Sequence, residues 1–209
     1  MDSIDQSCDS AMRAALGRCA TALLSDNLDR MPGAVGLRPF HRIDAIMVGR
    51  AFTVQVQPGD NLHLHKALDM ARPGDVMVVD GGAELSRALI GEIMVSIARA
   101  RGLAGFVIDG AIRDSAFIAA GDFPVFARGA IHRGPWKNGP GRCGVTVSVG
   151  GMCVAPGDWV VGDHDGVVAF PPDCAADLLA AVQAQEAREA QTLARIAAGT
   201  YAGDYALGG

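Results

Sequence analysis

The fold of this chain is decided by residues 76–114, which read VMVVDGGAELSRALIGEIMVSIARARGLAGFVIDGAIRD. Residues 76–79 form a short apolar run that is typical of a buried strand. Residues 91–101 carry apolar side chains at helical spacing, and Gly102 follows them as glycines do after a last helical turn. Residues 106–108 form a second apolar run. We therefore predict a βαβ unit, in which two parallel strands are joined by a right-handed crossover helix.

Segments on both sides extend this pattern into a larger α/β fold. The tripeptide Pro-Gly-Asp marks turns at residues 58–60, 73–75 and 156–158, and residues 109–110 read as a further turn. The predicted class is α/β with a mixed sheet, in one domain over residues 1–209. Apolar spacing predicts helices over about residues 10–28, 61–71, 112–120 and 171–198, and strands over 45–56, 125–126, 145–149, 152–155, 159–161 and 167–170.

Composition excludes several classes of protein. Of the 209 residues, 50% are hydrophobic and 20% are charged, which is not the composition of a disordered chain. A net charge of −5 and an aromatic content of 5% argue against a nucleic-acid-binding surface. No stretch approaches the roughly 20 apolar residues that span a membrane, and residues 1–8 lack a signal-peptide pattern. The five cysteines lack metal-binding spacing. We expect a cytoplasmic protein with reduced thiols.

Two neighbouring segments carry the candidate chemistry. Arg113 and Asp114 follow the second buried strand, and ligands of open α/β sheets bind beyond such strand ends. Gly91 opens the helix of the βαβ unit, where the free N–H groups of a first turn can bind a carboxylate or a phosphate. In a βαβ unit these two points lie at the same edge of the sheet. Taken alone, each also fits an ordinary helix start or a surface ion pair.

Together these segments predict a site for a small carboxylic acid and a hard cation. The helix start offers an anion cradle, Arg113 offers a guanidinium, and Asp114 offers a carboxylate for Mg²⁺ or Mn²⁺. The cradle consists of Gly91, Glu92, Ile93 and Met94.

Other candidate groups are less specific. His63 and His65 fall on opposite sides of a predicted helix rather than on one coordinating face. The glycine-rich residues 134–141 read as a surface loop or a lid. Lys66 and Lys137 are the only lysines, which leaves few candidates for a mechanism through an amine. The glycines that follow the buried strand at 76–79 form neither G-x-G-x-x-G nor a Walker sequence, which argues against a methyltransferase that binds S-adenosylmethionine.

The sequence resembles one protein family over about residues 10–200. Order and spacing follow the family of the 4-hydroxy-4-methyl-2-oxoglutarate / 4-carboxy-4-hydroxy-2-oxoadipate aldolases and the RraA-type regulators of RNase E. Some members carry an older label as dimethylmenaquinone methyltransferases. The matching segments are Asp60-Asn61-Leu62, residues 71–76 (ARPGDV), residues 79–82 (VDGG), Gly91-Glu92, residues 101–114, residues 156–158 and residues 163–167 (DHDGV).

The resemblance implies a fold, an assembly and a reaction. The fold would be a compact α/β/α-type sandwich with a mixed sheet. The assembly would be a homotrimer or homohexamer with active sites at subunit interfaces, to which the last helix (about 171–198) and the tail at 200–209 contribute. The reaction would be a divalent-metal-dependent (class II) cleavage of 4-hydroxy-2-oxo acids to pyruvate and a second 2-oxo acid. It passes through a pyruvate enolate, so oxaloacetate decarboxylation is expected at the same site.

The resemblance also implies roles for individual residues. Arg113 would bind the substrate, and Asp114 would hold the divalent metal. The backbone amides of residues 91–94 would hold the pyruvyl carboxylate, and Glu92 would order water at the metal. A glutamate on the last helix of a neighbouring subunit would reach the same water. By spacing this glutamate is Glu189, with Glu186 as the other choice.

One position departs from the family pattern. The aldolases usually have an acidic residue three positions after the metal aspartate, where this chain has Phe117. The pair Arg113-Asp114 is intact, whereas the regulator type is expected to have lost the metal aspartate. The sequence therefore favours an enzyme over a regulator that binds an RNase E-like partner without catalysis. The physiological 2-oxo acid, the choice of metal, and trimer against hexamer stay open at this point.

Overall fold

The computed structural model describes residues 4–30, 32–42 and 45–203, so most of the expected tail at 200–209 lies outside the described residues. In chain order the elements are α1 (Ile4–Leu16), α2 (Thr21–Asp26), β1 (Arg38–Pro39), β2 (Met47–Val56), α3 (Leu62–Met70), β3 (Asp75–Ile90), α4 (Glu92–Ala100), β4 (Gly105–Ile112), α5 (Ser115–Ala120), β5 (Val125–Ala130), β6 (Gly141–Cys143), β7 (Val147–Val149), β8 (Met152–Val154), β9 (Trp159–Gly162), β10 (Val167–Phe170), the 3-10 helix η1 (Pro172–Cys174) and α6 (Ala175–Ala197).

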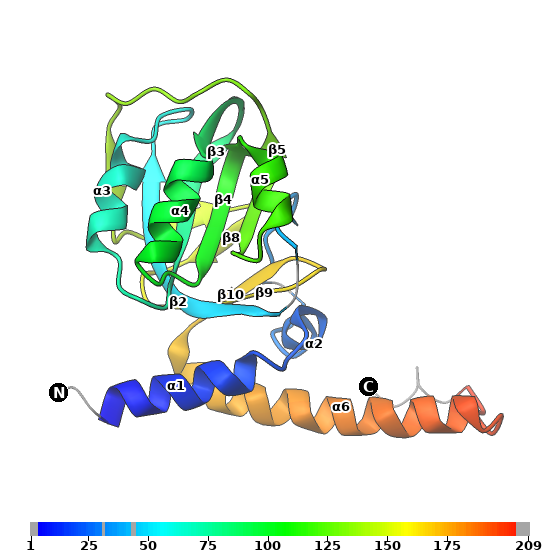
Figure 1. Ribbon diagram of the computed structural model, residues 1–209. Coiled ribbons are helices and arrows are strands. Elements are labelled where there is room, and N and C mark those ends of the chain that lie inside the picture. The colour runs from blue at the N-terminus through cyan, green and yellow to red at the C-terminus, as the bar shows by residue number, and fades with distance from the viewer. Residues whose placement is uncertain (1–3, 31, 43–44, 204–209) are drawn as a thin grey trace.

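A curled mixed sheet forms the centre of the molecule (Figure 1). Its strands lie in the order β1-β5-β4-β3-β2-β9-β10, and β6 also pairs with β2. The neighbours β2, β3, β4 and β5 are parallel, whereas β1, β6, β9 and β10 are antiparallel to the strands that they pair with. The unit β3-α4-β4 is the βαβ unit read from the sequence. The α/β class and the mixed sheet are confirmed.

The parallel strands are covered on both faces. Helices α3, α4 and α5 lie over one face (Figure 1), where Met77 and Val79 of β3 pack in a cluster with Met94 of α4. The β7–β8 hairpin lies over the other face, where Val78 packs in a cluster with Val149. Both alternating sets of side chains on β3 are therefore buried. This explains why residues 76–79 are apolar without the alternation of a half-exposed strand.

A third apolar cluster joins α1, α2 and α6 to the β9–β10 hairpin. It includes the buried side chains of Leu24, Trp159, Phe170 and Leu178. Helix α6 continues past this cluster and extends away from the rest of the chain (Figure 1). Within the described part of the chain, no helix is both long enough and apolar enough to cross a membrane.

The single helix predicted over residues 10–28 is wrong, because the structure has two helices there. Helix α1 ends at Leu16, the chain turns at Gly17, and α2 begins at Thr21. The carboxylate of Asp163, on the distant β9–β10 turn, accepts hydrogen bonds from the N–H of Thr21 (2.8 Å) and from its hydroxyl (2.6 Å). This contact caps the new helix start, and apolar spacing along residues 10–28 could not have indicated it.

The predicted turn at residues 109–110 is also wrong, and the helix predicted over 112–120 is present but begins three residues later than expected. Strand β4 runs through Asp109 to Ile112 and is buried throughout, and α5 begins only at Ser115. The Asp109 carboxylate accepts hydrogen bonds from the Arg128 side chain and from the N–H of Gly150 in the β7–β8 turn. These two partners satisfy a carboxylate inside a buried strand, which a local Asp-Gly pattern cannot reveal.

Candidate functional site

The candidate site forms where β3 and β4 end side by side. Ile90 at the end of β3 pairs with Ile112 at the end of β4. The N–H of Arg113 donates to the carbonyl oxygen of Ile90 at 2.9 Å, which continues the pairing by one residue. Gly91 leads directly into α4, so the helix start lies against the residues that follow β4. The convergence expected of a βαβ unit is therefore present.

The Asp114 carboxylate lies at the amino-terminal end of α4. Its Oδ2 accepts a hydrogen bond from the backbone N–H of Glu92 at 2.9 Å. Arg113 Nε is 3.7 Å from the same Oδ2, and both side chains are about two-fifths exposed, at 43% and 41%. Asp114 has a left-handed backbone conformation (φ 55°, ψ 39°), which turns the chain from β4 into α5. The carboxylate is thus fixed by backbone geometry and still open to a ligand.

Gly91 permits this close approach. A Cβ at this position would lie 2.4 Å from Asp114 Oδ2 and 2.9 Å from Arg113 Cγ. The backbone φ of −158° is one that any residue adopts, so the requirement for glycine is steric rather than conformational. The pair Arg113-Asp114 and the start of α4 can therefore pack together only because residue 91 has no side chain.

A small cavity of about 90 Å³ adjoins this arrangement. It is bounded by α4, by the ends of β3 and β4, by α3, and by the loop before β6. The lining residues include Gly91, Ile93, Met94 and Arg113 from the predicted set, and also Asn61, His65, Leu89, Ile90, Pro135 and Lys137. Glu92 and Asp114 are not among the lining residues, although they adjoin Gly91 and Arg113.

Three polar or charged lining residues had no role in the predicted site. Asn61 is 4% exposed and donates from Nδ2 to the carbonyl oxygen of Leu89, while its Oδ1 has no hydrogen-bond partner within the described chain. His65 is partly buried, and burial together with the nearby Lys137 lowers the pKa of its imidazole. Lys137 adds a second cationic side chain to a cavity that already contains Arg113. Two features of the sequence could have indicated these residues. Asn61 lies in one of the segments that carry the family resemblance, and Lys137 is one of only two lysines.

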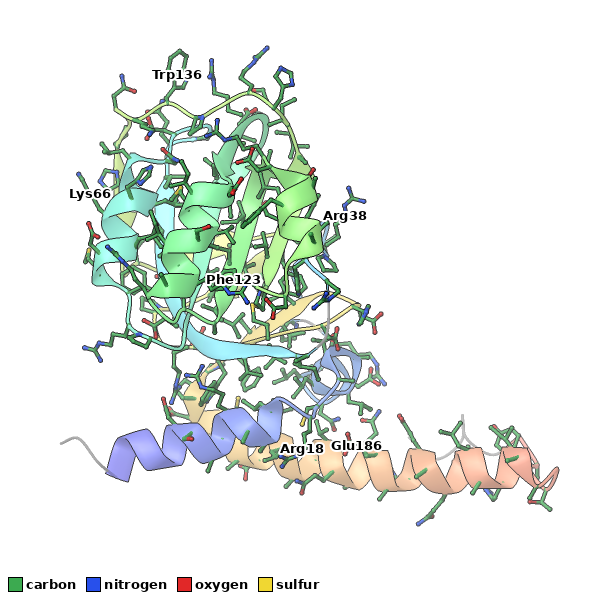
Figure 2. The ribbon with its side chains drawn as sticks, viewed as in Figure 1. Arg18, Arg38, Lys66, Phe123, Trp136 and Glu186 are labelled. Atoms are coloured by element: carbon green, nitrogen blue, oxygen red, sulfur yellow. The ribbon has the colours of Figure 1, made fainter. Side chains whose placement is uncertain are left out.

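The two glutamates of the last helix lie far from this cavity within one chain. Figure 2 labels Glu186 on α6, at the opposite end of the molecule from Trp136, whose neighbours Pro135 and Lys137 line the cavity. Glu189 lies one turn further along α6 and accepts a hydrogen bond from Gln185 Nε2 at 2.9 Å. The structure therefore does not bring Glu189 or Glu186 to Arg113 and Asp114. The expected contribution of Glu189 requires a second copy of the chain.

The donor groups present suit a hard cation that takes few protein ligands. Among the described residues there is no group of three or more His, Cys, Asp or Glu side chains that could enclose a metal ion. The Asp114 carboxylate is nevertheless exposed beside the cavity. Mg²⁺ commonly binds through one or two carboxylates, with water and substrate as its other ligands. Asp114 thus fits Mg²⁺ or Mn²⁺, and the arrangement is unlike a structural zinc site.

Comparison with known proteins identifies the family of the chain. A protein from Halalkalibacterium halodurans, provisionally named 4-hydroxy-4-methyl-2-oxoglutarate aldolase, is 43% identical over 152 residues, covering 72% of each chain. An uncharacterized protein from Pseudomonas syringae pv. tomato has a similar solved structure (TM-score 0.81, 29% identity, 91% of this chain and 94% of that one). The RNA-processing inhibitor RraA from Thermus thermophilus is also similar (TM-score 0.67, 30% identity, 74% and 93%). Residues 21–169 match the protein-family model that is described as RraA-like (Aldolase/RraA), and the chain belongs to this family.

Proposed function

We propose that the chain is a divalent-metal-dependent aldolase. It would cleave 4-hydroxy-2-oxo acids, such as 4-hydroxy-4-methyl-2-oxoglutarate or 4-carboxy-4-hydroxy-2-oxoadipate, to pyruvate and a second 2-oxo acid. The observation that carries this proposal is the packing of the Arg113-Asp114 pair on Gly91 at the start of α4, beside a cavity. The name of the bacterial relative supports the same class of reaction.

The start of α4 offers two backbone N–H groups for the substrate carboxylate. The first N–H groups of an α-helix have no acceptor within the helix. In α4 the N–H of Glu92 donates to Asp114, and the N–H of Val95 already donates to the carbonyl oxygen of Gly91. The N–H groups of Ile93 and Met94 lie between them, and both residues line the cavity. They would bind the pyruvyl carboxylate, aided by the positive end of the helix dipole.

Arg113 and Asp114 would act on the other end of the pyruvyl group. A divalent cation held by the Asp114 carboxylate would supply a Lewis acid that polarises the keto group of the substrate. The Arg113 guanidinium would donate hydrogen bonds to the keto oxygen, where negative charge develops as the C–C bond breaks. Glu92, with Glu189 from a neighbouring copy, would hold the water molecule that takes the proton from the 4-hydroxyl group.

Lys137 favours a substrate with a second carboxylate. Its side chain lines the cavity together with Arg113, so two cations border a volume of about 90 Å³. One cation would serve the pyruvyl part, and the other would pair with an anionic group further along the substrate. Both named hydroxy acids carry such a group. Oxaloacetate also carries one, and its decarboxylation passes through the same enolate, so we propose it as a side activity.

The decisive experiment measures pyruvate release from 4-hydroxy-4-methyl-2-oxoglutarate and from oxaloacetate, with Mg²⁺, with Mn²⁺ and with excess EDTA. We expect release that needs either cation and stops with EDTA, after subtraction of the background reaction without protein. Treatment with borohydride and pyruvate should leave the mass of the chain unchanged. A covalent adduct on Lys137 would instead show an amine mechanism, and EDTA-resistant turnover would exclude the metal mechanism.

A regulatory role is the second candidate function. It is favoured by the structural likeness to the Thermus thermophilus protein, which is named an RNA-processing inhibitor. Such a role would need a stable complex with an RNase E-like partner and no turnover. Co-purification of the chain with that partner, combined with a negative result in the pyruvate assay, would favour regulation over catalysis.

We also propose a homotrimer or homohexamer in the cytoplasm, with active sites at subunit interfaces. The distance of α6 from the cavity supports the interface, because Glu189 can reach the site only from another copy. Cys19, Cys143, Cys153 and Cys174 carry free thiols, which suits a reducing compartment.

A further inference from the structure

The loop before β6 is held against the turn before α3 by backbone hydrogen bonds. Trp136 donates its N–H to the carbonyl oxygen of Gly59 at 2.8 Å, and Asn61 donates its N–H to the carbonyl oxygen of Trp136 at 3.0 Å. Further along the same two segments, the N–H of Gln57 donates to the carbonyl oxygen of Pro140 at 3.1 Å. Backbone hydrogen bonds thus join two segments that are about 80 positions apart in the chain and lie beside the cavity.

The Asp60 carboxylate is the centre of this contact. It is 1% exposed, and within the described chain the hydrogen bonds that it accepts come from three backbone N–H groups. Oδ1 accepts from Leu62 at 2.9 Å, and Oδ2 accepts from Asn138 at 2.8 Å and from Gly139 at 2.7 Å. Burial raises the pKa of Asp60, but these three donors and the charge of the nearby His63 together leave the pKa below its ordinary value. The carboxylate is therefore charged near neutral pH.

Gly139 allows the loop to pack directly against Asp60, because it has no side chain. A Cβ at this position would lie 2.9 Å from Asp60 Cγ and 3.0 Å from Gln57 Cβ. Both distances are shorter than a side chain can adopt without displacing its neighbours. The loop therefore lies against Asp60 at the closest distance that a backbone allows.

Arg87 holds the other side of the same loop. Its Nη1 donates to the carbonyl oxygen of Gly134 at 2.8 Å, and its guanidinium lies 3.9 Å from the ring centroid of Trp136. Pro135 and Lys137, which line the cavity, lie between these anchors. The segment expected from sequence to be a surface loop or a lid is a loop, and hydrogen bonds hold it at both ends.

We propose that Asp60 is a positioning residue that clamps residues 134–140 as a fixed wall of the substrate cavity. The clamp sets the place of Pro135 and Lys137 in the cavity wall beside Arg113, so the cavity has its size before substrate arrives. Asp60 itself does not line the cavity and would act only through this loop. The inference rests on the proposed function for its kinetic consequence, whereas the clamp itself can be measured without any turnover.

The test compares two variants, one in each of the two segments that the clamp joins. Asp60→Asn removes the charge and places an amide NH₂ against N–H donors, and Gly139→Ala adds the Cβ that collides with Asp60. Asp158→Asn is the control for the first variant, because Asp158 is 8% exposed and accepts the N–H of Ala155 at 2.8 Å in a turn remote from the cavity. Gly121→Ala is the control for the second variant, since its Cβ would meet no atom closer than 3.6 Å.

Two measurements are made on each variant of the full chain. Amide hydrogen exchange over residues 134–141 should become about tenfold faster in both clamp variants, because two or more hydrogen bonds are weakened. KM for the hydroxy acid should rise about tenfold while kcat falls less, since the wall moves but Arg113 and Asp114 stay in place. Both controls should keep the exchange rates and KM of the unmodified chain.

The outcomes separate the clamp from the proposed function. Unchanged exchange in folded clamp variants would overturn the clamp. Faster exchange with an unchanged KM and a lower kcat would show a merely structural contact and overturn the positioning role. If Asp60→Asn does not fold, Gly139→Ala decides both points. If the unmodified chain shows no turnover, the aldolase proposal fails, and the exchange rates alone decide whether the clamp exists.

Discussion

At the scale of single residues, the Asp114 carboxylate serves two purposes at once. Its Oδ2 caps the start of α4 through the N–H of Glu92, while the group remains 41% exposed beside the cavity. The left-handed backbone at Asp114 is a conformation that aspartate and asparagine tolerate better than other residues with side chains. The position therefore combines a helix cap, a chain reversal and a candidate ligand in one small side chain.

The first prediction separates these purposes at Asp114. Asp114→Asn keeps an oxygen for the cap and tolerates the left-handed backbone, but it removes the negative charge. We expect an intact fold and a loss of metal-dependent pyruvate release of at least about a hundredfold. Asp122→Asn, which affects an exposed partner of Arg99, is the control. Circular dichroism and a Mg²⁺ titration of the rate check this, and an unchanged titration would remove Asp114 from the site.

The second prediction concerns Gly91. Gly91→Ala would place a Cβ 2.4 Å from Asp114 Oδ2, so the Arg113-Asp114 pair must move. We expect kcat/KM to fall about a hundredfold, because a displacement near 1 Å at a reacting group has effects of that size. Thermal unfolding of the variant should change little, since both side chains can move toward solvent. Wild-type kcat/KM in this variant would show that the packing on Gly91 is irrelevant to turnover.

At the scale of elements, distant polar contacts decide where helices begin and dock. Helix α2 has Ala20 at its N-cap, without a side-chain cap of its own, and Asp163 supplies the cap from the β9–β10 turn. Helix α1 is fixed to β2 by Asp9, whose two carboxylate oxygens accept from Arg50 at 2.5 and 3.1 Å. Arg50 also lies over the ring of the buried Trp159, at 4.1 Å from its centroid.

The third prediction tests the cap of α2. Asp163→Ala removes both hydrogen bonds to Thr21 and should lower the free energy of unfolding by about 1–2 kcal/mol, the size of a lost helix cap. Asp165→Ala changes a neighbouring aspartate in the same turn and should have an effect below about 0.5 kcal/mol. Urea unfolding followed by circular dichroism measures both values. Equal losses in the two variants would contradict the cap.

The fourth prediction concerns pH and α1. The hydrogen bonds from Arg50 lower the pKa of Asp9. The folded-state pKa is thus below the unfolded value of about 3.9. The contact therefore stabilises the fold above that pH, and this contribution is lost as the pH falls through the folded-state pKa. Asp9→Asn should be less stable than the unmodified chain at pH 7, and the two should converge in acid. A constant difference from pH 7 to pH 2 would contradict this account.

At the scale of the whole molecule, the rest of the described chain leaves the second half of α6 largely exposed. Its first half packs through Leu178 and Val182, which are 4% and 0% exposed. Its second half extends away from the body (Figure 1) and presents Leu193 and Ile196, which are 64% and 51% exposed. Apolar side chains on an extended helix are a common form of subunit contact. This half also carries Glu189.

The fifth prediction links assembly to turnover. The double variant Leu193→Asp, Ile196→Asp should lower the molar mass measured by light scattering and reduce pyruvate release, because Glu189 no longer reaches a neighbouring site. Met70→Asp, on α3 and 58% exposed, changes an equally exposed apolar residue away from α6 and should alter neither property. An unchanged molar mass in the double variant would show that α6 does not join subunits.

Local pattern was sufficient for the centre of the fold. The apolar residues 76–79 and 106–108 are strands, and the helix between them begins within one residue of Gly91. A continuous apolar run reflects burial of both faces of a strand, and helical spacing reflects burial of one face of a helix. The same logic placed Arg113, Asp114 and the start of α4 at one sheet edge, since a parallel crossover leaves no other arrangement. The sequence by itself therefore determined the class, the βαβ unit and the meeting of these groups.

Only the tertiary structure decided which loops complete the cavity and where several elements begin or end. Lys137 and Pro135 reach the cavity through hydrogen bonds between residues about 80 positions apart, centred on Asp60. Likewise Asp109 remains inside β4 because Arg128 and Gly150 satisfy its carboxylate, so the local Asp-Gly pattern predicts a turn that is absent. A buried carboxylate is tolerated only with partners, and these partners come from distant parts of the chain that no local pattern can specify.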